Sequence, residues 1–301
     1  MAGHCSDISI SIEKRTGDVL AVCFQAMASP CEILLSGCQD SVALTLAGPA
    51  AEEAWRVERK FSRYRDDSVL AWIHRNRGTE VSVDAETASL LDFAAQCYQI
   101  SGGRFDITSG VLRRVWKFDG SDRIPEPDDV DFLLGLIGFD KVSWRSPKLL
   151  VPADMELDFG GFGKEYAVDR AYDILAASCT VPFLVNFGGD LRASAPPANG
   201  AWHVGIERSQ GDGTAAMLLD LQQGALATSG DSHRFLLKNG VRYSHILDPL
   251  TGWPVIGAPC SVTVAASSCT EAGLLSTLAL LHGEHAGAFL AEQNVRHWIV
   301  R

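Results

Sequence analysis

The sequence predicts an α+β fold, and three observations lead to this prediction. Short strand-like runs and amphipathic helical stretches alternate irregularly along the 301 residues, whereas a doubly wound sheet would repeat them regularly. Two of the strand-like runs end in paired glycines, which are typical of breaks between elements. The composition, with 47% hydrophobic and 21% charged residues, is that of a globular domain. We expect a polar N-terminal extension over residues 1–18 and a single domain over 19–301.

The first half of the chain predicts a hairpin followed by two helices. The apolar runs 19–24 and 31–36 flank the small-residue segment QAMASP, which is typical of a turn between strands. Apolar residues at helical spacing predict helices over 48–64 and 85–100, the second of which stops at paired glycines. A charged connector over 119–131 then interrupts the pattern.

The second half alternates strands with two helices. A strand is predicted over 140–150, and helices are predicted over 165–178 and 270–282, the last ending at Gly283. Further strand-like runs, one of them with a glycine break, lie at 183–194, 202–207, 217–221, the segment RYSHI, 261–266 and 297–301.

Charge and cysteine usage exclude several classes of protein. A net charge of −11 argues against a broad electrostatic surface for nucleic acid or anionic lipid. No run of about 18 apolar residues is present, so we expect no membrane anchor, and the first residues lack the pattern of a secretory signal. The eight cysteines form no C-x-x-C pair and predict reduced thiols, which favours a cytoplasmic location.

The segment LDFGGFGKEY, residues 157–166, predicts a backbone loop that binds phosphate. Glycines permit unusual φ angles and close approach of a ligand, and N–H groups at the start of the following helix attract anions. The segment is not a Walker loop, because the required spacing is absent and Glu165 stands where that loop has a hydroxyl. The alternative is a glycine turn needed only for packing.

Several other polar groups are candidates for the same site. NFGGD at 186–190 and ATSGD at 227–231 suit contacts with a polar ligand, although either could be an ordinary bulge or turn. His245 could act as a general base near neutral pH or be structural. The hydroxyls of Ser276 and Thr277, within an apolar helix, either bond to the preceding turn or ligate a hard cation.

In order and spacing, these segments together resemble the FAD:protein FMN transferase (ApbE) family from about Phe24 to the C-terminus. The matching pieces are AMASPCEI, FSRYRDDSVL, GGRFDITSGVL, LDFGGFGKEYAVDRA, LVNFGGDLRA, ALATSGD, RYSHILDPLTG and SVTVAASSCTEAGLLSTLALL. The resemblance implies an α+β fold related to the T-fold, with mixed sheets and flanking helices. It also implies Mg²⁺-dependent transfer of the FMN moiety of FAD to a threonine of an acceptor protein, with release of AMP.

The resemblance assigns roles to individual residues. It implies that His245 takes the proton of the threonine hydroxyl. It implies metal ligation by the carbonyl of Gly163 and the side chain of Thr277, with Ser276 as a further candidate. The implied contacts with FAD are Met27, Tyr64, Arg104, Phe105, Asp106, Gly160, Tyr166 and Ile246.

Two departures from the family pattern fall at the implied metal site. The family helix carries an aspartate four residues before the threonine, on the same helix face, and this chain has Gly273 there. The family loop often ends G-I-A-K-G, whereas this one ends G-F-G-K-E and adds Glu165. Our hypothesis is that Glu165 replaces the aspartate. The alternatives are Glu271, which is rotated about 200° from position 273, and a weakened site with an exposed Glu165.

Two other functions fit the same residues. A non-catalytic FAD-binding protein would keep the pocket without the metal, and Gly273 favours it. A metal-dependent FAD pyrophosphatase would use water in place of threonine and give FMN and AMP. His245 and the intact glycine loop favour the two enzymatic hypotheses.

Overall fold

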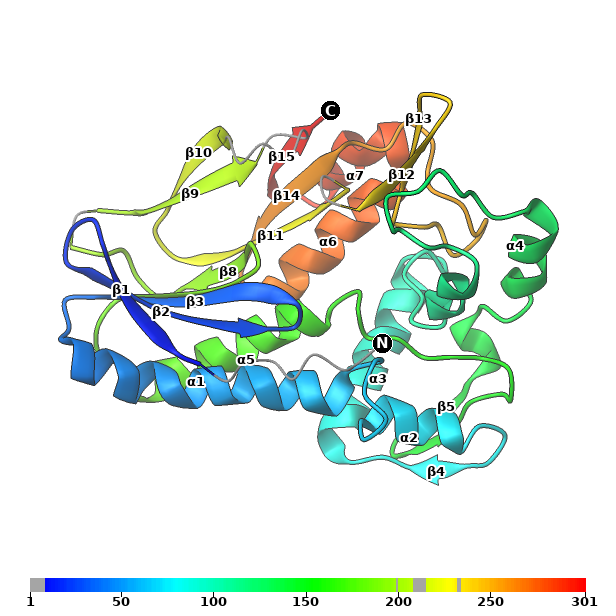
Figure 1. Ribbon diagram of the computed structural model, residues 1–301, viewed down its shortest axis with the longest axis horizontal. Helices are drawn as coiled ribbons and strands as arrows, with labels where there is room; N and C mark the ends of the chain where they lie inside the picture. Colours follow the sequence, from blue (N-terminus) through cyan, green and yellow to red (C-terminus); the bar gives the residue numbers. More distant parts are fainter. Residues whose placement is uncertain (1–8, 199, 208–214, 232–233) are drawn as a thin grey trace.

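The computed structural model describes residues 9–198, 200–207, 215–231 and 234–301. At its centre lies an eight-stranded sheet in which every neighbouring pair of strands runs antiparallel (Figure 1). Its strands, in spatial order, are β1 (Ser11–Arg15), β2 (Val19–Ala26), β3 (Ser29–Ser36), β7 (Phe183–Phe187), β8 (Asp190–Ala193), β11 (Gly224–Gly230), β14 (Ser261–Ala266) and β15 (Arg296–Val300).

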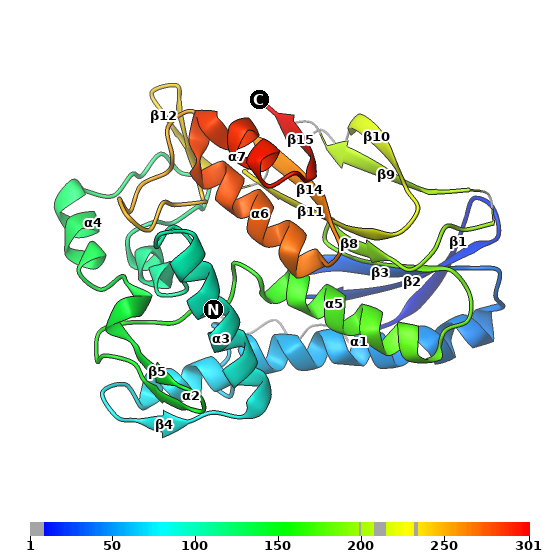
Figure 2. The ribbon, with the colours of Figure 1, turned by 180° about the vertical axis from the view of Figure 1, so that it is seen from behind.

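Four helices lie against one face of this sheet, as Figures 1 and 2 show. They are α1 (Asp40–Phe61), α5 (Gly163–Ser178), α6 (Cys269–Leu281) and α7 (Ala286–Glu292). The predicted α+β class is confirmed, since an antiparallel sheet carries its helices as a separate layer.

The sheet is buried on both faces, and β3 shows how the sequence achieves this. Ile33 and Leu35 belong to the large apolar cluster under the helices, while Leu34 between them packs into a second cluster. Side chains of a strand alternate between its two faces, so these residues point to opposite sides. The second cluster includes side chains from the hairpin of β9 (Trp202–Glu207) and β10 (Ala215–Leu221), which covers the other face.

The remaining elements gather beyond one end of the sheet, on the right of Figure 1. Some of them share an apolar cluster to which Leu112, Val130 and Leu236 belong, whereas others belong to the large cluster under the helices, as Leu91 and Leu149 do. The elements are α2 (Val69–Arg75), β4 (Val81–Ser82), α3 (Ala85–Ile100), η1 (Ser109–Arg114), α4 (Pro127–Leu134), η2 (Phe139–Lys141), β5 (Ser143–Arg145), β6 (Lys148–Leu150), β12 (Phe235–Lys238), β13 (Val241–Ser244) and η3 (Gly283–His285).

Helix α1 begins eight residues before the predicted start at 48, and this prediction was wrong. Pro49 lies inside the helix, where it removes one backbone hydrogen bond. Ala43 and Ala47 are fully buried and continue the stripe of small residues that faces the sheet. Packing of this stripe therefore outweighs the local signal of Gly48 and Pro49, which is typical of a helix start.

Two other segments differ from their predictions. The strand predicted over 140–150 is a hairpin of two short strands, because Pro147 interrupts the run and cannot donate to a ladder. The connector over 119–131 contains the start of α4, with Pro127 in its first turn. Within the N-terminal extension, residues 1–8 lie outside the described structure, and 11–15 form the charged edge strand β1.

The structure bears on two further properties. Within the described ranges, no helix is both long and apolar enough to cross a membrane. The seven cysteines for which the structure gives positions are all unpaired, and three of them are buried.

Candidate functional site

The glycine loop presents exposed backbone between two buried aromatic anchors. Phe159 and Phe162 are buried, and Gly160 and Gly161 between them are exposed. The N–H groups of Phe162 and Gly163 donate to the carbonyl of Phe159 at 3.1 and 2.7 Å, which closes the turn and starts α5. The loop thus leaves bare backbone beside a helix N-terminus, as an anion site requires.

Limited space rather than backbone angle favours glycine at 160 and 161, which corrects our expectation of unusual φ, and a Cβ at Gly163 would meet no atom closer than 4.0 Å. None of them has a positive φ, whereas Gly188 and Gly189 of the second glycine segment have φ of 61° and 95°. A Cβ on Gly161 would lie 3.3 Å from the ring of Phe105. The packing alternative therefore explains part of the motif, and the exposed faces of Gly160 and Gly161 stay available to a ligand.

A buried ion pair joins the two glycine segments. The Nζ of Lys164 lies 2.8 Å from Oδ2 of Asp190, which is 2% exposed, and Oδ1 of Asp190 accepts the N–H of Thr228 at 3.1 Å. Burial lowers the pKa of Lys164, but the charge and hydrogen bond of Asp190 outweigh it and hold this pKa above its ordinary value. Lys164 is therefore charged and fixed between α5 and β8.

Helices α5 and α6 meet beside this pair. Asp169 on α5 accepts the N–H groups of Cys269 and Thr270, each at 2.9 Å, and so caps the N-terminus of α6. One turn away, the side chain of Glu165 lies against the bare backbone of Gly273, where a Cβ would approach its Cγ to 2.7 Å. Burial, with the nearby charge of Asp190, raises the pKa of the Glu165 carboxyl to about 8.

Three hydroxyls form a directional chain on α6 and β11. Oγ of Ser276 donates to the carbonyl of Gly273 at 3.0 Å, and Oγ of Ser229 lies 2.8 Å from both Ser276 Oγ and Thr277 Oγ1. Each hydroxyl has one proton, so Ser229 donates to Ser276 and Thr277 donates to Ser229. The lone pairs of Thr277 Oγ1 then remain free for a ligand. The sequence pattern indicated the segment ATSGD as a whole and did not distinguish Ser229 within it.

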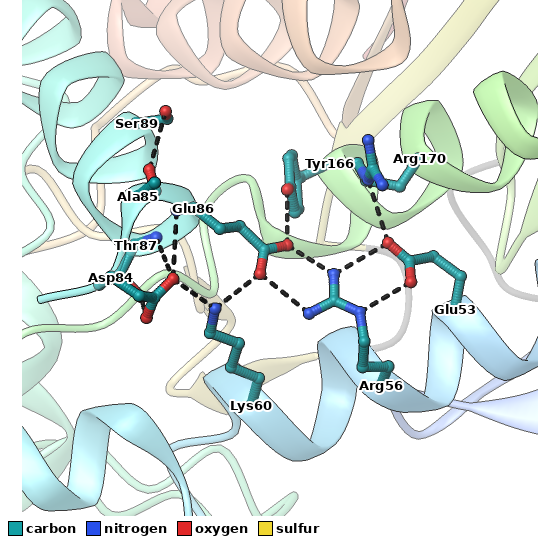
Figure 3. A network of polar contacts seen from close by, with 10 residues as sticks. All are labelled: Glu53, Arg56, Lys60, Asp84, Ala85, Glu86, Thr87, Ser89, Tyr166 and Arg170. Atoms are coloured by element: carbon teal, nitrogen blue, oxygen red, sulfur yellow. Dashed lines mark hydrogen bonds and ion pairs between the residues drawn. The ribbon is translucent and has the colours of Figure 1, made fainter.

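Tyr166 is held by a polar network that joins α1, α3 and α5 (Figure 3). Its hydroxyl donates to Oε1 of Glu86 at 2.7 Å. Arg56 donates to both Glu53 and Glu86, and Lys60 contacts Glu86 at 2.7 Å. The network fixes the first turns of α5, and with them the loop that precedes it.

We expect this network to make the protein less stable in acid. Burial raises the pKa of Glu86, but bonds from Arg56, Lys60 and Tyr166 outweigh it and lower this pKa to about 2. The stabilisation is complete above the ordinary pKa of about 4.5 and is lost as the pH falls toward 2. Urea unfolding at pH 7 and pH 3 should show a smaller acid loss in Glu86→Gln than in wild type.

An exposed carboxylate provides the control for this measurement. Glu80 pairs with Lys148 at the surface, where both side chains are more than half exposed. Glu80→Gln should lose as much stability in acid as wild type does. An equal acid loss in Glu86→Gln and Glu80→Gln would contradict a role for the network.

Most of the other residues predicted to contact FAD direct their side chains to partners within the protein. Asp106 is buried and accepts the N–H groups of Thr108 and Phe139, and Phe105 is 5% exposed. Arg104 donates to Asp248 at 2.9 Å and to the last carbonyl of α6, at Leu281, at 3.0 Å. Their side chains hold neighbouring segments in place, so Phe105 and Asp106 would contact FAD through their backbone atoms.

Two predicted contacts lie at the rim of the glycine segments. Tyr64 is 78% exposed, and its hydroxyl accepts from Arg63, which also pairs with Asp158 at the start of the loop. Met27 stands at the tip of the β2–β3 hairpin with a positive φ of 52°. The next strand residue, Ser29, lies 2.8 Å from where a Cβ of Gly188 would be.

His245 has the hydrogen bonding of a neutral base. Its Nδ1 lies 3.0 Å from the carbonyl of Arg234, which can only accept, so Nδ1 carries the proton and Nε2 keeps a lone pair. Burial lowers the pKa of the imidazole below its ordinary value. The neighbouring Ile246 packs against the apolar clusters that include α6.

The structure thus brings some predicted residues together and leaves others apart. Glu165, Gly273, Ser276 and Thr277 form one cluster at the α5–α6 contact. No contact found among the described residues joins His245 to that cluster. The described chain also holds no group of three His, Cys, Asp or Glu side chains arranged for a metal, so a cation here would take at least part of its ligands from hydroxyl and carbonyl oxygens.

Comparison with known proteins identifies the family. The model described as "ApbE family" matches residues 27–299. The FAD:protein FMN transferase of Treponema pallidum is 32% identical over 81% of this chain and 76% of its own, and that of Vibrio cholerae is 29% identical over 79% and 73%.

Solved structures give the same result. The ApbE protein of Thermotoga maritima superposes with a TM-score of 0.83 at 30% identity and covers 93% of both chains. The flavinyl transferase ApbE of Pseudomonas stutzeri superposes with a TM-score of 0.80 at 26% identity, over 97% of this chain and 92% of that one. The match of sequence and fold over nearly the whole length shows that the chain belongs to the ApbE family.

Proposed function

We propose that this chain transfers the FMN moiety of FAD to a threonine of an acceptor protein, in a Mg²⁺-dependent reaction that releases AMP. The observation that carries the proposal is the α5–α6 contact, where the helix that follows the exposed glycine loop packs against the helix of Thr277, whose Oγ1 keeps free lone pairs. Relatives named FAD:protein FMN transferase support the activity.

The reaction forms one bond and breaks one. The threonine oxygen bonds to the phosphorus of the FMN half, and the bond from that phosphorus to the bridging oxygen breaks, so AMP leaves with that oxygen. The threonine proton passes to Nε2 of His245, the nitrogen left free by the Arg234 carbonyl. The N–H groups of Gly160, Phe162 and Gly163 already bond within the loop. Gly161 and the start of α5 would therefore supply the N–H groups that bind the pyrophosphate.

The donor set fits Mg²⁺. This cation takes oxygen ligands, with one or two carboxylates and the phosphates of a substrate, rather than a cage of protein side chains. The carbonyl of Gly163 and Oγ1 of Thr277 would hold it. Ser276 is fully buried and bonds to both Gly273 and Ser229, so it supports Thr277 better than it could ligate the ion itself. When bound, Mg²⁺ neutralises charge on the pyrophosphate.

One assay separates this function from its alternatives. The protein is incubated with FAD, Mg²⁺ and a candidate acceptor protein, and the products are analysed by mass spectrometry. We expect an acceptor whose mass rises by that of FMN less water, together with AMP. Free FMN and AMP without modified acceptor would identify a pyrophosphatase, and unreacted FAD that stays bound would identify a binding protein.

We also propose that the reaction takes place in the cytoplasm. The unpaired state of the seven described cysteines supports a reducing compartment. The acceptor would then expose its threonine on the cytoplasmic side.

A further inference from the structure

Positions 165 and 273 share the volume of a single side chain. A Cβ on Gly273 would lie 2.7 Å from Cγ, 2.9 Å from Oε1 and 3.0 Å from Cδ of Glu165. Separations under about 3 Å do not occur between such atoms without displacement. The carboxylate of Glu165 therefore lies where the first atoms of any side chain at position 273 would lie.

The carboxylate of Glu165 lacks the partner that its burial requires. Its Oε2 is inaccessible to solvent and accepts no hydrogen bond, and among the side chains that the structure describes only Ser261 Oγ shares this state. Burying a polar atom without a partner is costly, and native proteins supply one in most cases. Packing against Gly273 alone does not account for a carboxylate here.

The nearby cation does not fill this role. Lys164 is adjacent in sequence, but its Nζ pairs with Asp190 at 2.8 Å and donates to the carbonyl of Gly188 at 3.4 Å. No ion pair of the described chain includes Glu165. A cation that pairs with the Glu165 carboxylate would therefore come from outside the protein.

Two residues with oxygen atoms suited to a cation lie close to Glu165 along α5 and α6. Gly273 and Thr277 lie four residues apart on one face of α6, so a carboxylate that covers Gly273 lies beside Thr277. Gly163 belongs to the same first turn of α5 as Glu165. The other acidic residue near the start of α6, Glu271, accepts from Ser267 at 2.7 Å instead.

We propose that Glu165 supplies the carboxylate ligand of the divalent cation at this site, from α5 across the gap that Gly273 leaves in α6. The proposal rests on the Mg²⁺ dependence in the proposed function. It makes the ion a link between the two helices, bound to α5 through Gly163 and Glu165 and to α6 through Thr277.

The test measures binding of Mn²⁺ and Mg²⁺ without any turnover. Free Mn²⁺ is counted by electron paramagnetic resonance as it is titrated into wild type, Glu165→Gln and the control Glu271→Gln, and Mg²⁺ is then added as competitor. We expect Glu165→Gln to bind Mn²⁺ at least about tenfold more weakly, because removing even an outer partner of a metal ligand costs about 10- to 100-fold. Glu271→Gln should bind as wild type does.

Moving the carboxylate from position 165 to position 273 distinguishes loss of a ligand from misfolding of the variant. Gly273→Asp alone should impair the fold, because its Cβ collides with Glu165. The double variant Glu165→Ala with Gly273→Asp should unfold in urea near wild type and recover Mn²⁺ affinity to within about tenfold, as a carboxylate returns to the same volume. Wild-type affinity in a folded Glu165→Gln, or no recovery in a folded double variant, would overturn the proposal.

The two proposals fail separately. Wild type that modifies its acceptor while Glu165→Gln keeps full Mn²⁺ affinity would refute the role of Glu165 and leave the transfer intact. Mn²⁺ binding that depends on Glu165 in a protein that modifies no acceptor would refute the transfer and leave the metal site intact.

Discussion

Replacing His245 with alanine should lower the rate of FMN transfer by about 10²- to 10⁴-fold, the usual contribution of a general base. The Arg234 carbonyl holds the proton on Nδ1, so Nε2 is the free base, and burial keeps the imidazole neutral near pH 7. Alanine removes the only proton acceptor that we assign to the threonine hydroxyl. Single-turnover transfer to the acceptor, followed by mass spectrometry, measures the loss.

Two further measurements separate a base from a structural residue. FAD affinity should change little in His245→Ala, because we assign the imidazole a bond to the threonine hydroxyl and none to FAD or the cation. The transfer rate of wild type should decrease as the pH is lowered below about 6.5, the ordinary pKa of an imidazole, because the base is then protonated. His285, which is exposed and lies 3.6 Å from Glu284, provides the control, and His285→Ala should keep full activity. Transfer by His245→Ala at the wild-type rate would refute the assignment.

Local sequence patterns predicted whether most long elements are helices or strands. The predictions failed where tertiary packing determines the bounds of an element. The burial of Ala43 and Ala47 extends α1 through Pro49, and no local rule shows that these alanines face a sheet. The short helix α2 was missed, although Ser68 caps it by accepting the N–H of Ala71. A seven-residue helix offers too few turns for its apolar spacing to be recognised.

The candidate site was predicted segment by segment, but its contacts were not. The hypothesis that Glu165 replaces the aspartate missing at Gly273 came from a family pattern, and only the fold shows that the two positions share one volume. The hydroxyl chain from Thr277 through Ser229 to Ser276 joins a strand to a helix, so no spacing along the chain predicts it. Sequence patterns report neighbours along one element, whereas these contacts depend on which elements pack together.

Replacing Asp190 with alanine should lower the free energy of unfolding by about 3 kcal/mol, the lower end for a buried ion pair that loses one partner. The lower end applies because the Lys164 side chain is 29% exposed and water can reach it in part. The variant leaves Lys164 without its anion and the N–H of Thr228 without its acceptor. Urea unfolding followed by tryptophan fluorescence gives the difference.

The control for Asp190 is an aspartate that pairs with a basic side chain at the surface. Asp119 and Arg123 lie 3.0 Å apart, and their side chains are 45% and 78% exposed. Exposed pairs contribute about 0–1 kcal/mol, so Asp119→Ala should change the unfolding free energy by less than about 1 kcal/mol. Asp190→Asn keeps an acceptor for Thr228 and should fall between the two. If Asp190→Ala lowered the free energy of unfolding no more than Asp119→Ala does, the buried pair would not hold the two glycine segments together. That result would mean that Lys164 can reach solvent in the variant without distorting either loop.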